Sequence, residues 1–246
     1  MHITPLNKNF SNKNKILMVK CDVSNNEEVK NMIELARSEF TKIDILVNNA
    51  GVYGPKGPFE DNNLQEWKNS FDINFYGSIL PIRHLIKHFK TNNYGKVIQL
   101  SGGGATSPLP NLSSYAASKA AVVRFIETIS KEIEDYNIFL NSIAPGALDT
   151  RMLDEIIEAG PELIGKEFYE KMINVKKNGG TNPYFAVELV TYLASSLSDG
   201  VSGKLISAVW DNWLEFHENK EDIKRSDIFT LRRIVGKDRE MHWADK

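Results

Sequence analysis

Short apolar segments alternate with amphipathic ones along most of the chain, and this alternation restricts the fold more than any other feature. Residues 43–51 (IDILVNNAG) are almost entirely apolar up to a polar turn, which is typical of a strand buried on both faces of a parallel sheet. The first helix is expected to begin at Ser24, because Glu27 three residues later completes a capping box. The alternation predicts an α/β fold in three layers (α/β/α) on a doubly wound parallel sheet. Further strands are predicted over 16–23, 96–101, 138–146 and 204–210, and helices over 24–40, 64–91, 115–135 and 183–197.

The composition excludes several classes of protein. The chain has 246 residues, 41% of them hydrophobic and 25% charged, which is enough for one large domain with a buried core. A formal net charge of −2 without a basic stripe argues against nucleic acid as a partner. No apolar run reaches the ~20 residues that span a bilayer, and the first residues carry no secretory signal. Because its single cysteine, Cys21, also fits a reducing compartment, we expect a soluble, cytoplasmic protein without a membrane partner.

The last part of the chain, residues 211–246, departs from the alternating pattern. It is rich in charge, but it also contains more large apolar groups than disordered segments usually carry. We therefore divide the chain into a single domain over 1–210 and a C-terminal extension over 211–246. The extension is expected to pack on its own domain, on a lid or on a neighbouring subunit.

Tyr115 and Lys119 are four residues apart at the start of a predicted helix, so their side chains should lie on one face. An ammonium beside a phenol favours the phenolate, which should lower the pKa of Tyr115 from its usual value of about 10. Such a pair suits proton transfer to or from a substrate oxygen. The spacing alone is also compatible with an exposed helical pair, so the interpretation depends on the surrounding motifs.

Four further motifs accompany Tyr115-Ala-Ala-Ser-Lys119: Asp22-Val23, Asn48-Asn49-Ala50-Gly51, Asn74 within FDINFYGS, and Pro145-Gly146-Ala-Leu-Asp-Thr150. Together these motifs make the chain similar to the short-chain dehydrogenase/reductase family, whose members are NAD(P)-dependent oxidoreductases on a Rossmann-type sheet. The resemblance runs from about residue 16 to residue 210. All of these motifs follow or flank predicted strands, at the edge where open α/β sheets bind ligands.

The resemblance implies a role for each motif. Tyr115 would transfer the proton, Lys119 would bind the nicotinamide ribose and acidify Tyr115, and Asn74 would anchor a water that relays protons to Lys119. Asn49 would be a structural amide that joins neighbouring strands. The cofactor, NAD or NADP, would be held by Tyr115 and Lys119 and by Asp22, Val23, Asn48, Ala50, Gly51, Pro145, Gly146, Leu148 and Thr150.

The beginning of the chain departs from the family pattern. Members usually start with a strand, a glycine-rich phosphate-binding turn, a helix and a second strand, and no Gly-x-x-x-Gly-x-Gly motif lies near this N-terminus. Three explanations stay open. The first, which we favour, is that the sequence is a shortened version of a longer ancestor. The second is that a second copy supplies the missing part. The third is that the protein is a fragment that no longer binds cofactor. We expect the 246-residue chain to bind NAD(P) weakly or not at all.

The catalytic serine of the family is the second departure. It lies thirteen residues before the tyrosine, where this chain has Gly102. The neighbouring Ser101 should point away, because one step along a strand reverses the side-chain direction, unless the glycines form a bulge. Thr106 or Ser107 could take its place. Losing one hydrogen-bond donor to the substrate oxygen can cost about 10²–10³-fold in rate.

These features support two hypotheses about function. The first is an NAD(P)-dependent oxidoreductase that transfers a hydride between nicotinamide and a small-molecule carbonyl or secondary alcohol, without a metal. The alternative is a catalytically silent relative that acts by binding, as a partner subunit, or a truncated fragment, given Gly102 and the missing phosphate loop. In either case we expect a homodimer or homotetramer, because the long helices over 64–91 and 115–135 pair across two-fold axes in the family. The mixed charges of residues 149–180, which would shape the substrate pocket, fit a polar, sugar-like molecule only loosely.

Overall fold

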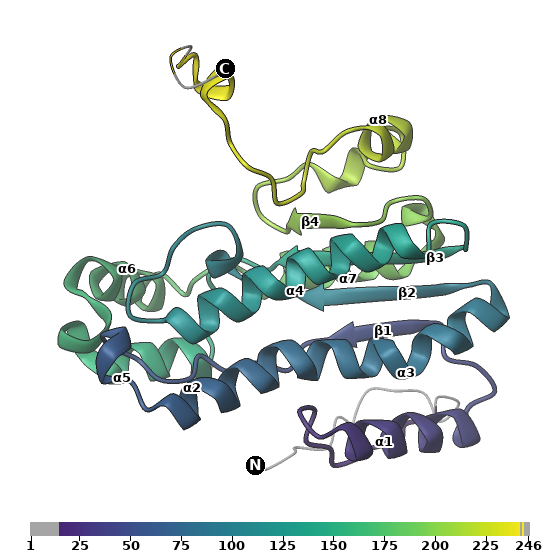
Figure 1. Ribbon diagram of the computed structural model, residues 1–246, viewed down its shortest axis with the longest axis horizontal. Coiled ribbons are helices and arrows are strands. Elements are labelled where there is room, and N and C mark those ends of the chain that lie inside the picture. The colour runs from purple at the N-terminus through teal and green to yellow at the C-terminus, as the bar shows by residue number, and fades with distance from the viewer. Residues whose placement is uncertain (1–14, 242, 244–246) are drawn as a thin grey trace.

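The structure, a computed structural model, describes residues 15–241 and 243 and has one parallel sheet (Figure 1). Neighbouring strands pair in chain order, with Val47 opposite Ile98 and Ile98 opposite Asn141. The predicted parallel α/β sheet is thus confirmed. Its strands are β1 (Ile45–Asn48), β2 (Gly95–Leu100), β3 (Ile138–Ala144) and β4 (Lys204–Ser207).

Helices cover both faces of the sheet, as the side-chain alternation of the strands requires. Val97 faces helices α3 (Gly77–Asn92) and α4 (Ser113–Glu132), where it joins a buried apolar cluster with Leu85 and Ile126. The next residue along β2, Ile98, faces the other way and packs with Leu189 of α7 (Pro183–Ala194). Helix α1 (Asn26–Glu39) packs beside α3, outside the strands (Figure 1). The chain therefore forms the expected three layers.

The predicted helix over 64–91 is present but has a local change of winding. Helix α2 (Leu64–Phe71) passes through a π-helical turn (Asp72–Tyr76) directly into α3. Such turns shift the register of a helix by one residue and often carry functional side chains. Here the turn contains Asn74, one of the predicted site residues.

Residues 16–23 do not form the predicted strand. They pair with no strand in the described chain, Val23 already lies in a turn, and Met18 is 69% exposed. An apolar, β-branched segment becomes a strand only where a neighbour completes its ladder, so propensity was a poor guide here. The cap of the next helix was also wrong by one residue, because Asn25, not Ser24, accepts hydrogen bonds from the backbone of Glu27 and Glu28.

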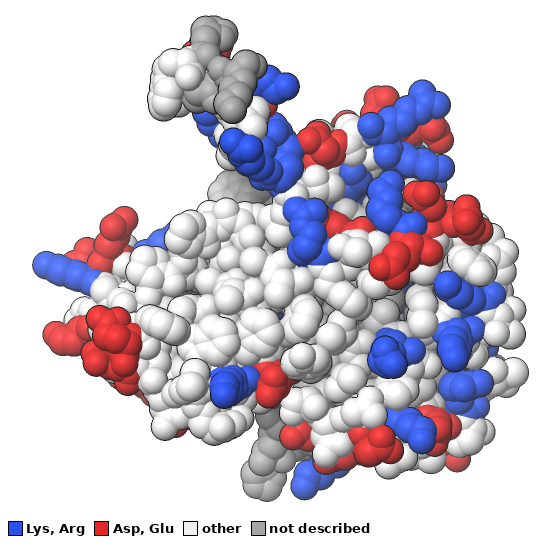
Figure 2. Space-filling model, in the orientation of Figure 1, with Lys and Arg blue, Asp and Glu red and all other residues white. Residues whose placement is uncertain are grey.

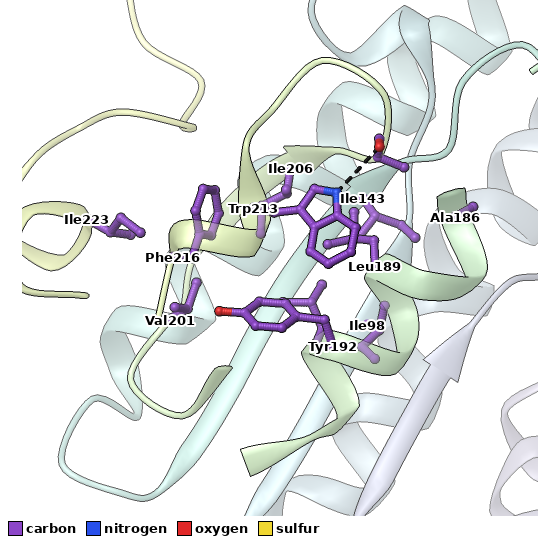
Figure 3. Close-up of a cluster of buried hydrophobic side chains, with 12 residues drawn as sticks. Ile98, Ile143, Ala186, Leu189, Tyr192, Val201, Ile206, Trp213, Phe216 and Ile223 are labelled. Atoms are coloured by element: carbon purple, nitrogen blue, oxygen red, sulfur yellow. Dashed lines mark hydrogen bonds between the residues drawn. The ribbon is translucent and has the colours of Figure 1, made fainter. Parts of the chain in front are cut away.

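The first part of the C-terminal extension packs on the domain itself (Figure 3). Trp213, Phe216 and Ile223 join the buried cluster that lies between α7 and the sheet, and the Trp213 ring lies 5.5 Å from that of Tyr192. Ile223 belongs to the short helix α8 (Lys220–Arg225). In the part of the chain that the structure describes, no helix is long and apolar enough to cross a membrane.

Candidate active site

Tyr115 and Lys119 lie on the first turns of α4, beside the carboxyl end of β2. The Nζ atom of Lys119 lies 5.6 Å from the centre of the Tyr115 ring and donates a hydrogen bond of 2.9 Å to the carbonyl of Leu100. Both side chains are buried, with Tyr115 8% and Lys119 4% exposed. The i, i+4 spacing therefore brings the phenol and the ammonium together, as predicted.

Asn74 ties the loop after β1 to α4. Its Oδ1 accepts a hydrogen bond of 2.9 Å from the backbone N–H of Val52, and its Nδ2 donates to the carbonyl of Val52 at 2.9 Å and to Ser118 Oγ at 3.0 Å. Gly51 lies between the predicted residues, since a Cβ atom there would be 3.3 Å from Asn74 Oδ1 and 3.6 Å from Lys119 Nζ. A larger residue at position 51 would crowd this junction, so the glycine permits the close approach of loop and helix.

Tyr115 lies beneath two helices that follow β3, α5 (Arg151–Ile164) and α6 (Lys166–Lys177). Its ring lies 4.6 Å from that of Tyr53, and apolar side chains of both helices complete the cluster: Leu153, Ile156, Ile164 and Met172. Burial and the nearby Tyr53 hydroxyl raise the pKa of Tyr115, and burial lowers the pKa of Lys119 to about 8. The expected lowering of the Tyr115 pKa was therefore wrong for this state of the protein, because desolvation outweighs the nearby ammonium.

Gly102 takes the position directly against the phenol. Its backbone is extended, and a Cβ atom on it would overlap with the hydroxyl oxygen of Tyr115. Ser101 is buried, and its Oγ has no hydrogen-bond partner among the described residues. Thr106 and Ser107, the other candidates for the missing serine, are exposed. Residue 102 thus faces the tyrosine and carries no side chain.

The structural amide at the end of β1 is Asn48, whereas we predicted Asn49. Asn48 is buried, and its side-chain amide donates a hydrogen bond of 2.9 Å to the carbonyl of Ser78 in α3. Asn49 and Ala50 are exposed. Asn48 is therefore the structural amide, and it joins the strand to a helix instead of to a neighbouring strand.

Asp22 and Val23 lie in the turn before α1. The Asp22 carboxylate accepts hydrogen bonds from the backbone and the hydroxyl of Ser24, which lower the pKa of Asp22. Val23 packs against Gly77, where a Cβ atom would collide with the valine side chain. This contact fixes the turn against the start of α3.

The loop after β3 closes against the segment that follows α6. Gly146 has a φ of 90°, and the carbonyl of Ala147 accepts a hydrogen bond of 2.7 Å from the backbone of Thr181. Leu148 forms an isolated antiparallel bridge with Gly180, while Pro145 is half-buried and Thr150 caps α5. These residues of the predicted cofactor loop thus lie together, across the carboxyl ends of β3 and β4.

Sequence reasoning missed three residues of this site: Tyr53, Lys176 and Thr181. Lys176 binds Asp149 at 2.7 Å and Asp154 at 2.9 Å, and so holds α6 against the start of α5. The Asn-Asn-Ala-Gly turn could have indicated Tyr53, which follows it by two residues. The ion pairs of Lys176 had no sequence signal, because they join residues more than twenty positions apart.

The residues present fit the nicotinamide end of NAD(P). Gly51 leaves space between Asn74 and Lys119, Gly146 turns the backbone in a left-handed conformation, and Lys119 offers a buried cation. For the pyrophosphate, the described residues contain no glycine-rich turn between a strand and a helix before β1. Among the same residues, no group of three or more His, Cys, Asp or Glu side chains is placed to hold a metal ion.

Comparisons with known proteins agree with this geometry. The family model described as short chain dehydrogenase matches residues 3–160. The chain is 31% identical over 206 residues to a diacetyl reductase [(S)-acetoin forming] of Staphylococcus epidermidis, with 81% of this chain and 80% of that enzyme covered. It is 34% identical over 186 residues to 3beta-hydroxysteroid dehydrogenase 1 of Eggerthella lenta, with 75% of this chain and 69% of the relative covered.

A solved structure shows the same architecture. NAD+-bound xylitol dehydrogenase superposes with a TM-score of 0.66 at 25% identity, and the match covers 76% of this chain and 75% of that one. The similarity thus extends over most of both chains.

Proposed function

Because the chain belongs to the short-chain dehydrogenase/reductase family of oxidoreductases, we propose that it transfers a hydride between nicotinamide and the carbon of a carbonyl or secondary alcohol. The observation that carries this proposal is the buried Tyr115–Lys119 pair with Asn74 and Gly51 packed against it. The nicotinamide cofactor, NAD or NADP, supplies or accepts the hydride when bound. Residues of the chain carry out all the other steps.

In this proposal Tyr115 moves the proton at the substrate oxygen. Its hydroxyl fills the space that a side chain at residue 102 would take, so a substrate oxygen has to reach it from another side. The high pKa of the buried phenol keeps it protonated at neutral pH, ready to donate in the direction of reduction. In the direction of oxidation, the phenolate has to be stabilised by the charged form of Lys119.

Lys119 orients and tunes Tyr115, and we propose that its ammonium also binds the nicotinamide ribose. One of its three donors is already engaged by Leu100, which leaves two for a ribose hydroxyl and a water. Both N–H groups of the Asn74 amide are used by Val52 and Ser118, and its Oδ1 accepts one hydrogen bond from Val52. Asn74 is therefore a positioning residue through its side chain, and its Oδ1 keeps one acceptor site for a relay water.

The contacts around Tyr115 favour a substrate with apolar substituents. Tyr53, Leu153, Ile156 and Met172 pack around the phenol, whereas Asp149 and Asp154 bind Lys176 at the surface. The names of the two relatives state diacetyl and a 3beta-hydroxysteroid as their substrates. We therefore propose a small, mainly apolar ketone or secondary alcohol instead of a sugar.

The apolar outer surface of α3 and α4 supports the proposed homodimer or homotetramer. Figure 2 shows few charged side chains over the middle of this face. A groove between the two helices is lined by Ile79, Ile86, Phe125 and Ile129. Apolar surface of this kind usually marks a protein contact.

Two observations favour the second candidate function, a relative that binds without catalysis. Gly102 replaces the serine that would hold the substrate oxygen, and the pairing of β1 on one side only leaves its other edge open in the described chain. The test is turnover of NADH or NADPH with a panel of apolar ketones at millimolar cofactor. Reduction that requires Tyr115 supports the enzyme, and ligand binding without turnover at any cofactor concentration supports the alternative.

A further inference from the structure

The carbonyl of Leu100, at the end of β2, lies where the strands β1 and β2 part. Asn48 opposite Gln99 is the last pair of their register, so Leu100 follows the end of the ladder between them. Two side chains donate hydrogen bonds to this carbonyl, Lys119 through Nζ at 2.9 Å and Gln99 through Nε2 at 3.1 Å. Because a carbonyl oxygen has two lone pairs, both donors can bind it at the same time.

Gln99 is completely buried, and its amide suits the carbonyl of Leu100 in only one orientation. The reversed amide would place two acceptor oxygens against each other. In the observed orientation the Oε1 atom of Gln99 has no hydrogen-bond partner among the described residues. Since a buried polar atom without a partner is unfavourable, an apolar side chain of the same length would fill this position better. The donor that Gln99 offers to Leu100 is therefore the property that distinguishes it from such a side chain.

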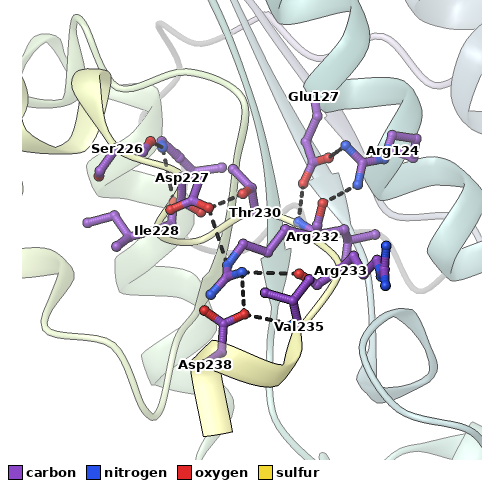
Figure 4. Close-up of polar contacts among 12 residues, drawn as sticks. Arg124, Glu127, Ser226, Asp227, Ile228, Thr230, Arg232, Arg233, Val235 and Asp238 are labelled. Carbon is purple, nitrogen blue, oxygen red and sulfur yellow. Dashed lines mark hydrogen bonds and ion pairs between the residues drawn. The ribbon is translucent and has the colours of Figure 1, made fainter. Parts of the chain in front are cut away.

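Lys119 is bound differently from a buried lysine with a structural role. Lys204 is also buried, and it donates to the carbonyls of Ser226 and Ile228, both at 3.0 Å, in the C-terminal segment that Figure 4 shows. In the described chain, no second side chain donates to either of these carbonyls. Lys204 thus holds two carbonyls alone, whereas Lys119 holds one carbonyl and shares it.

The ammonium of Lys119 has room to move from its bond with Leu100. Gly51 borders it without a side chain, since a Cβ atom there would lie 3.6 Å from Nζ. Turning the other donors of the ammonium to the ribose of a cofactor would lengthen or break the bond to Leu100. A largely buried carbonyl that loses its partner is unfavourable, but Leu100 would keep the amide of Gln99.

We propose that Gln99 is a positioning residue for Lys119, and that it keeps the carbonyl of Leu100 hydrogen-bonded while the ammonium turns to its ligand. The premise is the proposed role of Lys119 at the ribose, and Gln99 is the group that makes this movement favourable. Gln99 is too deeply buried to contact substrate or cofactor, so it acts only through the shared oxygen. Lys119→Met imitates the state in which the ammonium has left.

A double-mutant cycle between residues 99 and 119 tests whether the two donors replace each other. Urea unfolding compares the unmodified chain, Gln99→Met, Lys119→Met and the double variant, because methionine removes each donor and keeps an unbranched side chain. If either donor satisfies the carbonyl, the double variant should raise the equilibrium constant of unfolding about tenfold more than the product of the two single effects. Single effects that simply multiply would overturn the proposal.

Ser142→Ala supplies the matched control for this cycle. Ser142 lies opposite Gln99 in the register of β2 and β3, is buried, and has a hydroxyl without a partner among the described residues. Combined with Lys119→Met, its effect should multiply within about twofold, because its hydroxyl makes no hydrogen bond to Leu100. A coupling as strong as that of Gln99 would show that any polar change in this layer affects Lys119, and would also overturn the proposal.

Nuclear magnetic resonance of the glutamine side chains gives a second test, which leaves Gln99 in place. The chain has two glutamines, so labelling this amino acid yields the signals of Gln99 and of Gln65, which is exposed and donates to Asn69. Burial lowers the pKa of Lys119 to about 8. The amide signal of Gln99 should therefore shift with a midpoint close to pH 8, this shift should disappear in Lys119→Met, and Gln65 should not respond.

A Gln99 signal that stays constant on both sides of pH 8, or that shifts equally in Lys119→Met, would overturn the sharing of the carbonyl. Both experiments use the chain without cofactor or substrate. Their outcome is therefore independent of turnover, so a failure of the proposed function and a failure of the role of Gln99 can be told apart.

Discussion

Gly102 and Tyr115 are in direct contact, so that a side chain at residue 102 would overlap with the tyrosine hydroxyl. The phenol is held from the other side by the Tyr53 ring at 4.6 Å and by the helices α5 and α6. The phenol can therefore occupy this position only because residue 102 has no side chain. It follows that restoring the serine of the family pattern should not restore a missing function.

Gly102→Ser should accordingly reduce turnover by at least about tenfold, because Tyr115 has to leave its position. The control is Gly103→Ser, since a Cβ atom at residue 103 meets no atom within 4 Å. Steady-state kinetics of both variants with one ketone check this prediction. Higher turnover in Gly102→Ser than in the unmodified chain would contradict it.

The buried ammonium of Lys119 should make stability depend on pH. Its pKa is about 8 in the folded chain and about 10.5 when exposed, so between these values the unfolded chain binds the additional proton. The free energy of unfolding should then rise with pH from about 8 to about 10.5, by about 3 kcal/mol at 1.36 kcal/mol per pKa unit. Below pH 8 Lys119 is protonated in both the folded and the unfolded chain, so it causes no further change of the free energy of unfolding with pH.

Urea unfolding of the unmodified chain and of Lys119→Met at several pH values measures this effect as the difference between the two proteins. Lys131→Met removes an exposed lysine of the same helix and serves as the control. A constant difference between the unmodified chain and Lys119→Met from pH 7 to pH 10 would show that Lys119 is not desolvated.

The spacing of Tyr115 and Lys119 predicted their contact, because an α-helix fixes the geometry of residues four apart. The pKa of Tyr115 was predicted in the wrong direction, because its burial comes from Tyr53 and from helices α5 and α6, which are distant in the sequence. Likewise, the turn after β1 was recognised, but which of Asn48 and Asn49 points inward depends on the phase of a short strand.

The parallel pairing of β1 to β4 also followed from the alternating pattern. Residues 16–23 show where that pattern fails, since a strand needs a partner as well as a suitable composition. The reciprocal hydrogen bonds of Asn74 with Val52 had no signal beyond the resemblance, because they join two separate elements.

Asn74→Ala should lower the free energy of unfolding by about 2–3 kcal/mol, since it removes the partner of both the backbone N–H and the carbonyl of Val52, as well as the donor to the buried Ser118 Oγ. Asn69→Ala, on the preceding turn, removes an exposed side chain and should change stability by less than about 0.5 kcal/mol. Chemical denaturation of both variants provides the comparison. Equal decreases in the free energy of unfolding for the two variants would mean that the hydrogen bonds of the Asn74 side chain contribute nothing to stability.

Trp213→Ala should lower the free energy of unfolding by about 3–5 kcal/mol, because the side chain is buried between α7 and the C-terminal extension. Trp210→Ala lies three residues earlier, is 85% exposed and should have almost no effect. The same denaturation experiment compares them. A small loss for Trp213→Ala would show that the extension does not belong to the folded domain.

The most direct test of the proposed function is the turnover of Tyr115→Phe at saturating NADH or NADPH, with binding of the cofactor measured in parallel. This substitution removes the hydroxyl and keeps the ring that packs on Tyr53. For any longer form of the protein that binds the cofactor, we predict that turnover is abolished while cofactor affinity stays nearly the same, and that Tyr53→Phe keeps most of its activity. Turnover of Tyr115→Phe within about tenfold of the unmodified chain would contradict the assignment of Tyr115 as the proton donor.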